Sequence, residues 1–289
     1  MKDVVVVQGE FTKSAGALTW WELSGQTDLG VLTEAWEDAA VGEDYLVKQT
    51  TPCAALGQAV NERCHERHLL ARPLPGGSAW ALVKESVEGI GRGAELSHET
   101  GLRAWIDDST MNVLVLDPEM TATSDALAES YQKMLSSIAV GPMGGWLVRL
   151  ATTLCSGVAM RRCGGFYYIP PEHLGLWRDI TDAVGESGDH LFHFAPVMRS
   201  EELIQSVSHA VEREAADLIR AIREDMKGDV ELGKRALRTR RARVATMRTK
   251  LAGYRSLVGG ALKHTEAGVD ELEMKLAKLG LLAATAEDN

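Results

Sequence analysis

The chain has 289 residues, of which 45% are hydrophobic and 25% are charged, a composition that suits one large or two ordinary globular domains and excludes a disordered chain. The net charge of −10 disfavours indiscriminate binding to nucleic acid or anionic membranes, and four cysteines do not make a disulfide scaffold. The first residues lack a secretory signal, and no apolar stretch reaches the roughly 20 residues of a membrane span. We therefore expect a soluble, cytoplasmic protein without membrane contact.

Candidate strands and helices alternate in the first part of the chain. Residues 4–7 and 17–23 are short runs of β-branched or aromatic side chains, which are typical of strands. Asp28 precedes apolar residues spaced three and four apart, so we expect it to cap a helix that extends to about residue 39. Pro52 stands where a second helix would begin, because the first turn tolerates its missing N–H.

The middle of the chain changes to the two-residue period of strands. Residues 69–73 and 78–85 flank a Leu-Pro-Gly-Gly sequence, which indicates a hairpin. Two further strands are expected at 102–106 and 112–116, joined by a turn at 107–109. We therefore predict an antiparallel sheet in this region.

Helices and short strands are expected again up to residue 198. Together with the preceding elements they form a predicted α/β region over residues 1–198, with a division into two lobes near 117–124 as an option. Gly141-Pro142 is expected to separate two of the helices. The expected elements are helices over 121–137 and 145–154, a strand at 166–169, a helix opened by Pro170-Pro171, and a strand at 191–194.

The last part, residues 199–289, is predicted to be a coiled-coil-like helical hairpin or bundle. Apolar residues recur every seven positions with interleaved charge. A turn is expected at Gly259-Gly260, because glycine costs about 1 kcal/mol in a helix interior. A register shift near Gly228 leaves two alternatives, a second turn or a stutter in one longer helix. The seam residues are Val230, Leu237, Val244, Met247, Leu251, Val258, Leu262, Val269, Leu272, Leu276 and Leu279. The fold class is therefore α+β, a mixed or antiparallel sheet region with packed helices followed by this bundle.

A basic run lies within this bundle. One interpretation is a helix that contacts phosphates; the other is a solvated face whose arginines pair with acids on neighbouring helices. The nearby acids and the lack of interleaved aromatic residues favour the second. Eight of the seventeen residues from 234 to 250 are basic: Lys234, Arg235, Arg238, Arg240, Arg241, Arg243, Arg248 and Lys250. All of these except Arg240 and Arg243 are the candidate nucleic-acid-binding residues.

Metal-ligating residues are few. Cys64 and His68 lie four apart on a predicted helix, and Cys53 precedes them, but a structural zinc site needs four ligands with short paired spacings. Cys64 also fits the apolar stripe of its helix. We therefore predict no metal, with Cys53, Cys64 and His68 as the minor alternative.

Catalytic motifs are also missing from the sequence. The chain contains no phosphate loop, no Gly-x-Ser-x-Gly and no His-Glu-x-x-His. His190 and His193 occupy opposite faces of their predicted strand, so they cannot act together. Asp107, Asp108, Asp117 and Glu119 offer a carboxylate cluster at one end of the sheet, with no nucleophile to pair with and a metal site as the alternative. We predict no catalytic residues and no cofactor, and a non-enzymatic role is favoured.

Several short motifs between residues 17 and 87 form one pattern. They are Leu-Thr-Trp-Trp-Glu-Leu at 18–23, a helix with Leu32, Ala35 and Trp36, Pro52 followed by Ala-Ala-Leu-x-x-Ala-Val at 54–60, Leu-x-Arg-Pro-Leu at 70–74, and Trp-Ala-Leu-Val-x-Glu at 80–85. This pattern resembles an uncharacterised family of about 300 residues found in bacteria, archaea and their viruses. The resemblance implies no activity and no site residues, but it favours a phage or mobile-element origin, with the host cytoplasm as the location if the protein is viral.

The leading functional hypothesis is an interaction or assembly protein that forms homo-oligomers or binds a protein partner through its C-terminal helices. The large share of residues in helical seams, with no catalytic constellation elsewhere, supports it. The first alternative is a nucleic-acid-binding protein that uses the basic helix. The second is a small-ligand-binding or counter-defence protein with a site in the α/β region.

Overall fold

The computed structural model describes residues 14–39, 41–42, 45–67, 69–88, 95–162, 164–226 and 234–285. The α+β class is confirmed. The chain forms two compact units, each assembled from segments distant in sequence. The first unit comprises residues 1–22, 147–182 and 191–289, and the second comprises residues 23–146 and 183–190. The sequence predicts a boundary between domains near residue 198, whereas the two units of the structure are divided elsewhere. Whether residues 1–198 and 199–289 fold independently stays a prediction. The predicted strand at 4–7 lies outside the described residues.

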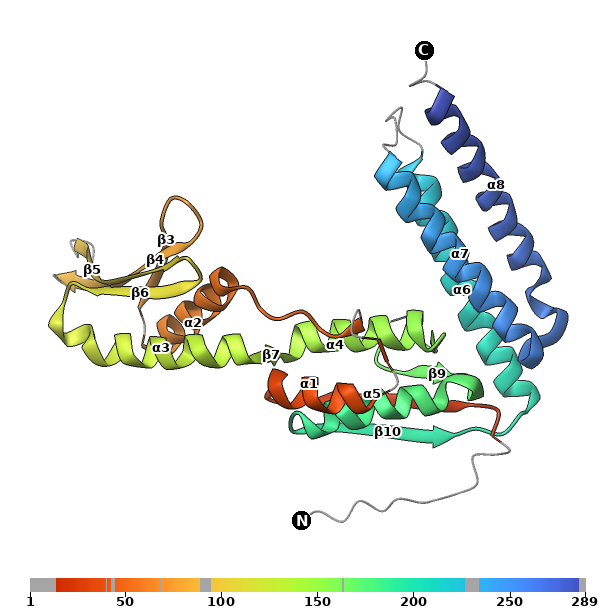
Figure 1. Cartoon of the computed structure of the whole chain (residues 1–289), viewed down its shortest axis with the longest axis horizontal. Helices are drawn as coiled ribbons and strands as arrows, with labels where there is room; N and C mark the ends of the chain where they lie inside the picture. Colours follow the sequence, from red (N-terminus) through yellow and green to blue (C-terminus); the bar gives the residue numbers. More distant parts are fainter. Residues whose placement is uncertain are drawn as a thin grey trace. The chain divides into compact units, whose positions relative to one another are not determined.

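The second unit is organised around a four-stranded antiparallel sheet in the order β3-β4-β5-β6. Figure 1 shows α2 and α3 lying along one face of this sheet. Leu82 and Leu102 pair across neighbouring strands and are fully buried beneath these helices. The predicted hairpin, strands and helices are thus confirmed here. Their bounds are α2 (Pro52–Arg67), β3 (Leu70–Pro73), β4 (Ala79–Glu88), β5 (Glu95–Asp107), β6 (Thr110–Val115), η4 (Pro118–Met120) and α3 (Thr121–Ser136).

The β5–β6 turn has the backbone of a type I′ hairpin. Asp108 and Ser109 have φ values of 44° and 67°, and Asp107 pairs with Thr110 across the turn. The Tyr131 hydroxyl of α3 donates to the Ser109 carbonyl oxygen at 3.5 Å. The predicted turn at 107–109 is confirmed.

A short two-stranded sheet completes the second unit. β2 (Gln26–Asp28) pairs with β7 (Ser137–Ala139), and Asp28 caps α1 (Leu29–Asp38) as expected, accepting from the Gly30 and Val31 N–H groups at 2.8 and 3.0 Å. The expected break at Gly141-Pro142 is wrong. These residues lie in the first turn of α4 (Val140–Arg149), where proline needs no N–H partner, and β7 provides the break.

The first unit contains a second four-stranded sheet, in the order β10-β1-β9-β8. The Trp177 side chain of α5 is fully buried, and its indole N–H donates to Thr19 Oγ1 at 3.2 Å. Trp21 stacks on Tyr167 with ring centroids 5.1 Å apart. The elements are β1 (Ala17–Leu23), the π-helical turn Leu150–Leu154, β8 (Val158–Ala159), β9 (Tyr167–Ile169), η6 (Pro171–His173), α5 (Leu174–Glu186) and β10 (His190–Pro196).

Three long helices complete the first unit: α6 (Glu201–Asp225), α7 (Lys234–Val258) and α8 (Lys263–Thr285), which lie side by side (Figure 1). The turn at Gly259-Gly260 is confirmed: it is η7 (Gly259–Leu262), which starts at a glycine with φ of +62°. Gly228 lies outside the described residues. Val158 and Tyr168 of the sheet belong to the same buried cluster as the helices. None of the described helices is both long and apolar enough to span a membrane.

Candidate functional site

The predicted seam forms the core of the three-helix bundle within a single chain. Nine of its residues are at most 6% exposed. Leu279 is 38% exposed, and Val230 lies outside the described residues. The seam is therefore covered without a second copy of the chain. The nine are Leu237, Val244, Met247, Leu251, Val258, Leu262, Val269, Leu272 and Leu276.

Several basic side chains of α7 bind groups on the neighbouring helices. Arg240 pairs with Asp225 at 2.9 Å, and Arg248 pairs with Glu273 at 2.7 Å. Arg241 donates to two backbone carbonyl oxygens of α8, those of Leu276 and Ala277, at 3.0 and 3.1 Å. Several of the basic side chains of α7 are therefore already bound to groups within the bundle.

Lys250 is the most deeply buried of these cations, with 4% exposure. Its Nζ lies 2.8 Å from both carboxylate oxygens of Glu214 and donates to the carbonyl oxygens of Gly157 and Thr152 at 2.6 and 3.4 Å. Burial lowers the pKa of Lys250, and the charge of Glu214 opposes that shift. Lys250 is therefore a structural residue and is not available to phosphates.

Three arginines of α7 remain outside these contacts. Arg235, Arg238 and Arg243 are exposed, and among the described residues they have no ion-pair or hydrogen-bond partner. Arg235 and Arg243 lie eight residues apart, two turns along one helix face. Thr239 lies between them. A shallow hollow of about 490 Å³ is lined by these two arginines and by Thr239, Ala236, Arg240 and Asp225. We call Arg235, Arg238 and Arg243 the free arginine set. The Lys234 side chain lies outside the described part.

The charge of the chain is distributed unevenly. Residues 199–289 contain 17 lysines and arginines against 15 acids, whereas residues 1–198 contain 14 against 26. Helix α7 contains no acidic residue along its 25 positions. The bundle is therefore the basic part of an acidic protein, and its uncompensated charge lies on α7.

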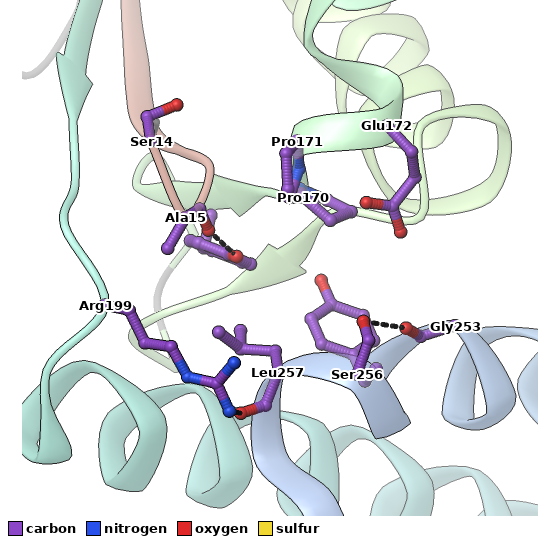
Figure 2. A pocket seen from close by; sticks show the side chains of 11 residues that line it. Ser14, Ala15, Pro170, Pro171, Glu172, Arg199, Gly253, Ser256 and Leu257 are labelled. Atoms are coloured by element: carbon purple, nitrogen blue, oxygen red, sulfur yellow. Dashed lines mark hydrogen bonds between the residues drawn. The ribbon is translucent and has the colours of Figure 1, made fainter. Parts of the chain in front are cut away.

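A pocket of about 260 Å³ lies beside the C-terminal half of α7 (Figure 2). Its apolar lining includes Pro170, Pro171 and Leu257. Figure 2 shows Glu172 and Arg199 on opposite sides of the pocket. Arg199 donates to the Leu257 carbonyl oxygen at 3.1 Å, and this contact satisfies a carbonyl at the end of α7. The pocket thus has an acid on one wall and a cation on the other.

Two tyrosines form the buried base of this pocket. The Tyr254 hydroxyl donates to the Ser156 carbonyl oxygen at 2.8 Å, and the Tyr168 hydroxyl donates to the Ala15 carbonyl oxygen. Burial raises the pKa of both tyrosines above the ordinary value. The burial of the two rings and their hydrogen bonds hold them in place, so they form a fixed wall of the pocket.

The other sequence candidates do not converge on one site. Cys64 is buried, Cys53 is exposed, and His68 lies outside the described residues. Within the described part of the chain, no three His, Cys, Asp or Glu side chains are grouped to hold a metal ion. Asp117 caps η4 and pairs with Lys84, which lowers the pKa of the Asp117 carboxyl.

The two histidines are also separate. His190 is buried in the second unit, with Nε2 2.8 Å from Thr27 Oγ1, and burial lowers its pKa. His193 stacks on Trp20 in the first unit, with ring centroids 5.0 Å apart. The two histidines thus contact different residues, Thr27 for His190 and Trp20 for His193.

A model of a family of unknown function, DUF6744, matches residues 15–288. The chain belongs to this family. The resemblance seen over residues 17–87 is thus confirmed, and it extends over almost the whole sequence. Comparison with curated proteins gives no match. Comparison with solved structures gives none either. Family membership therefore supplies no activity, and any function must be argued from the geometry of this chain.

Several residues of interest were not predicted as site residues. Arg243 was not among the nucleic-acid-binding candidates, although it belongs to the free arginine set. Tyr168 and Glu172 lie close together in sequence, but the pocket forms only where Arg199 and Leu257 come near them from distant parts of the chain, which no local pattern shows. Gly253 is the exception: a glycine within a predicted helix costs about 1 kcal/mol relative to alanine, and this signal was present in the sequence.

Proposed function

We propose that this chain is a nucleic-acid-binding protein that contacts phosphates through the free arginine set of α7. The observation that carries the proposal is the absence of carboxylate partners for Arg235, Arg238 and Arg243 among the described residues, on a helix without acids. Every other described cation of α7 contacts a group on a neighbouring element. The three remaining guanidinium groups are thus available to phosphates.

The expected binding is weak and strongly dependent on salt. Each phosphate neutralised by a cation contributes about 0.9 to the slope of log K against log salt concentration for duplex DNA, and about 0.7 for single strands. Three arginines therefore predict a slope of roughly −2 to −3. The net charge of −10 lowers affinity further, so the interaction should be measurable at low salt and lost near physiological salt.

The test compares the wild type with the triple variant Arg235→Gln, Arg238→Gln, Arg243→Gln. The matched control is Arg220→Gln, Arg223→Gln, Lys275→Gln, which removes the same charge from the same bundle at residues that pair with Asp217 and Glu271. Fluorescence anisotropy with a labelled 30-base single strand and a 30-base-pair duplex is read at 50 and 200 mM salt.

We expect the first triple variant to lose at least tenfold in affinity at 50 mM salt and the control to lose less than threefold. Equal losses in the two variants would mean that only net charge matters, and this result would refute a site on α7. No binding of either probe by the wild type at 50 mM salt would refute the proposal as a whole.

Assembly of copies of the chain remains a second proposal. The seam that suggested it is covered within one chain, so an assembly requires another surface. Met274, 61% exposed on α8, is one apolar side chain of the bundle that such a surface would use. Mass measurement by light scattering at micromolar concentration, with Met274→Lys as the variant, separates the two proposals: a monomer removes assembly and leaves phosphate binding unaffected.

A further inference from the structure

The pocket beside α7 has the features of a ligand site that neither the fold nor phosphate binding requires. Its volume of about 260 Å³ is close to the lower end, about 300 Å³, of small-molecule sites in proteins. The fixed tyrosine rings and two prolines give it a rigid wall. Rigid walls lower the entropic cost of binding, because fewer groups must become ordered.

Gly253 of α7 is one of the residues that line this pocket. It lies within α7, where glycine is the least favourable residue apart from proline. Its φ is not positive, so the backbone does not require glycine. A Cβ atom placed there would meet no heavy atom within 4 Å, so packing does not require glycine either. Gly253 is one of the residues that line the pocket, so we expect a bulky side chain at this position to reduce the space for a ligand.

The charges on the pocket walls define the ligand chemistry. Glu172 is exposed and has no ion-pair partner among the described residues. Arg199 uses one Nη atom on the Leu257 carbonyl, which leaves further N–H donors of its guanidinium for an anion. Figure 2 places the two charges on opposite sides of the pocket, with Pro170 and Pro171 beside Glu172 and Leu257 beside Arg199.

We propose that this pocket binds a small molecule with a cationic group at one end, an anionic group at the other and an apolar middle. A short peptide with free ends is the simplest molecule of this class: its ammonium group would pair with Glu172 and its carboxylate with Arg199. The apolar middle would cover the prolines and the ring faces. A free α-amino acid has its two charges on one carbon, so we expect it to pair less well with charges on opposite walls.

The binding test uses the full chain and four probes: the dipeptide Leu-Ala, its N-acetylated form, its C-terminal amide, and free leucine. Isothermal titration and thermal shift are measured with each at up to 10 mM. We expect saturable binding of Leu-Ala and at least tenfold weaker binding of both blocked forms and of leucine. No binding of Leu-Ala at 10 mM, or equal binding of the blocked forms, would overturn the proposal.

Two variants locate the site. Glu172→Gln removes an exposed carboxylate without a described partner, so the fold should not change. The affinity of this variant for Leu-Ala should be at least fivefold lower than that of the wild type. Its affinity for the N-acetylated peptide should equal that of the wild type, because that peptide has no ammonium group. An equal loss for both peptides would overturn the assignment of Glu172.

Gly253→Leu should abolish binding by filling the pocket. The matched control is Gly175→Leu, at an exposed glycine of α5 where a Cβ atom also meets nothing within 4 Å. Circular dichroism checks that both variants fold. Unchanged Leu-Ala affinity in folded Gly253→Leu would show that the peptide binds elsewhere and would overturn the proposal.

Discussion

Lys250 of α7 and Glu214 of α6 form an ion pair in which the ammonium group lies 2.8 Å from both carboxylate oxygens. The same ammonium group also binds the carbonyl oxygens of Thr152, within the π-helical turn, and of Gly157, in the segment that leads to β8. One buried ammonium group thus connects α6 and α7 to the segment that precedes β8. A basic residue in the middle of the basic run is therefore part of the core.

Replacement of this lysine should be one of the costliest single changes in the basic run. Lys250→Met leaves the two carbonyl groups and part of Glu214 without a partner in a buried place. We expect the free energy of unfolding to fall by about 3 kcal/mol, measured by urea denaturation. Lys263→Met, at an exposed lysine of α8, is the control and should change it by less than 0.5 kcal/mol. A loss below 1 kcal/mol in Lys250→Met would contradict the structural role.

The stability of the protein should depend on pH through His190. Burial lowers its folded pKa below 6.5, and its Nδ1 atom is buried without a partner among the described residues. The unfolded chain therefore binds a proton at higher pH than the folded chain does. The contribution of His190 to stability is complete above pH 6.5 and is lost as pH falls below it, at up to about 1.4 kcal/mol per pH unit.

The measurement is urea denaturation at pH 7.5 and pH 5.0 for the wild type and His190→Gln, whose amide keeps a polar contact for Thr27. The variant should lose less stability between the two pH values than the wild type loses. His193→Gln, at the other histidine of β10, is the control for the substitution itself. Equal differences in all three proteins would show that His190 does not titrate in this range.

Truncation in the seam distinguishes a bundle within one chain from an interface between chains. Leu251 is 1% exposed, so Leu251→Ala should lower the free energy of unfolding by about 3 kcal/mol. Because the seam is covered within one chain, the denaturation midpoint should not change between 1 and 50 μM protein. A midpoint that rises with concentration would show that copies of the chain share this seam.

Local interactions explain which parts of the fold the sequence predicts. The Asp28 cap, the Pro52 helix start and the turn at 107–109 each depend on residues within four positions of one another, and all three are present. The strands β2 and β7 were not predicted. They have three residues each and exist because Thr27 pairs with Ile138, more than one hundred positions away.

The site was harder to predict than the fold for the same reason. The acids near the basic run indicated internal pairing, but which arginines pair depends on how α7 is rotated in the bundle. Arg240 and Arg248 turn toward Asp225 and Glu273, whereas Arg243 between them does not. No spacing rule distinguishes these positions, because the rotation is set by the packing of all three helices.

The type I′ turn offers a stabilising substitution. Ser109 has φ of +67°, a conformation that costs a residue with a Cβ atom roughly 1 kcal/mol and costs glycine little. Ser109→Gly should therefore raise the free energy of unfolding by about 0.5 kcal/mol, after subtraction of the extra entropy of glycine in the unfolded chain. The contact from Tyr131 is to the Ser109 backbone carbonyl, so the substitution keeps it. Gln132→Gly, at an exposed position inside α3, is the control and should destabilise by about 1 kcal/mol, because glycine is unfavourable in a helix interior. A decrease in stability in Ser109→Gly would mean that the serine hydroxyl makes a contact that offsets the strain of the turn.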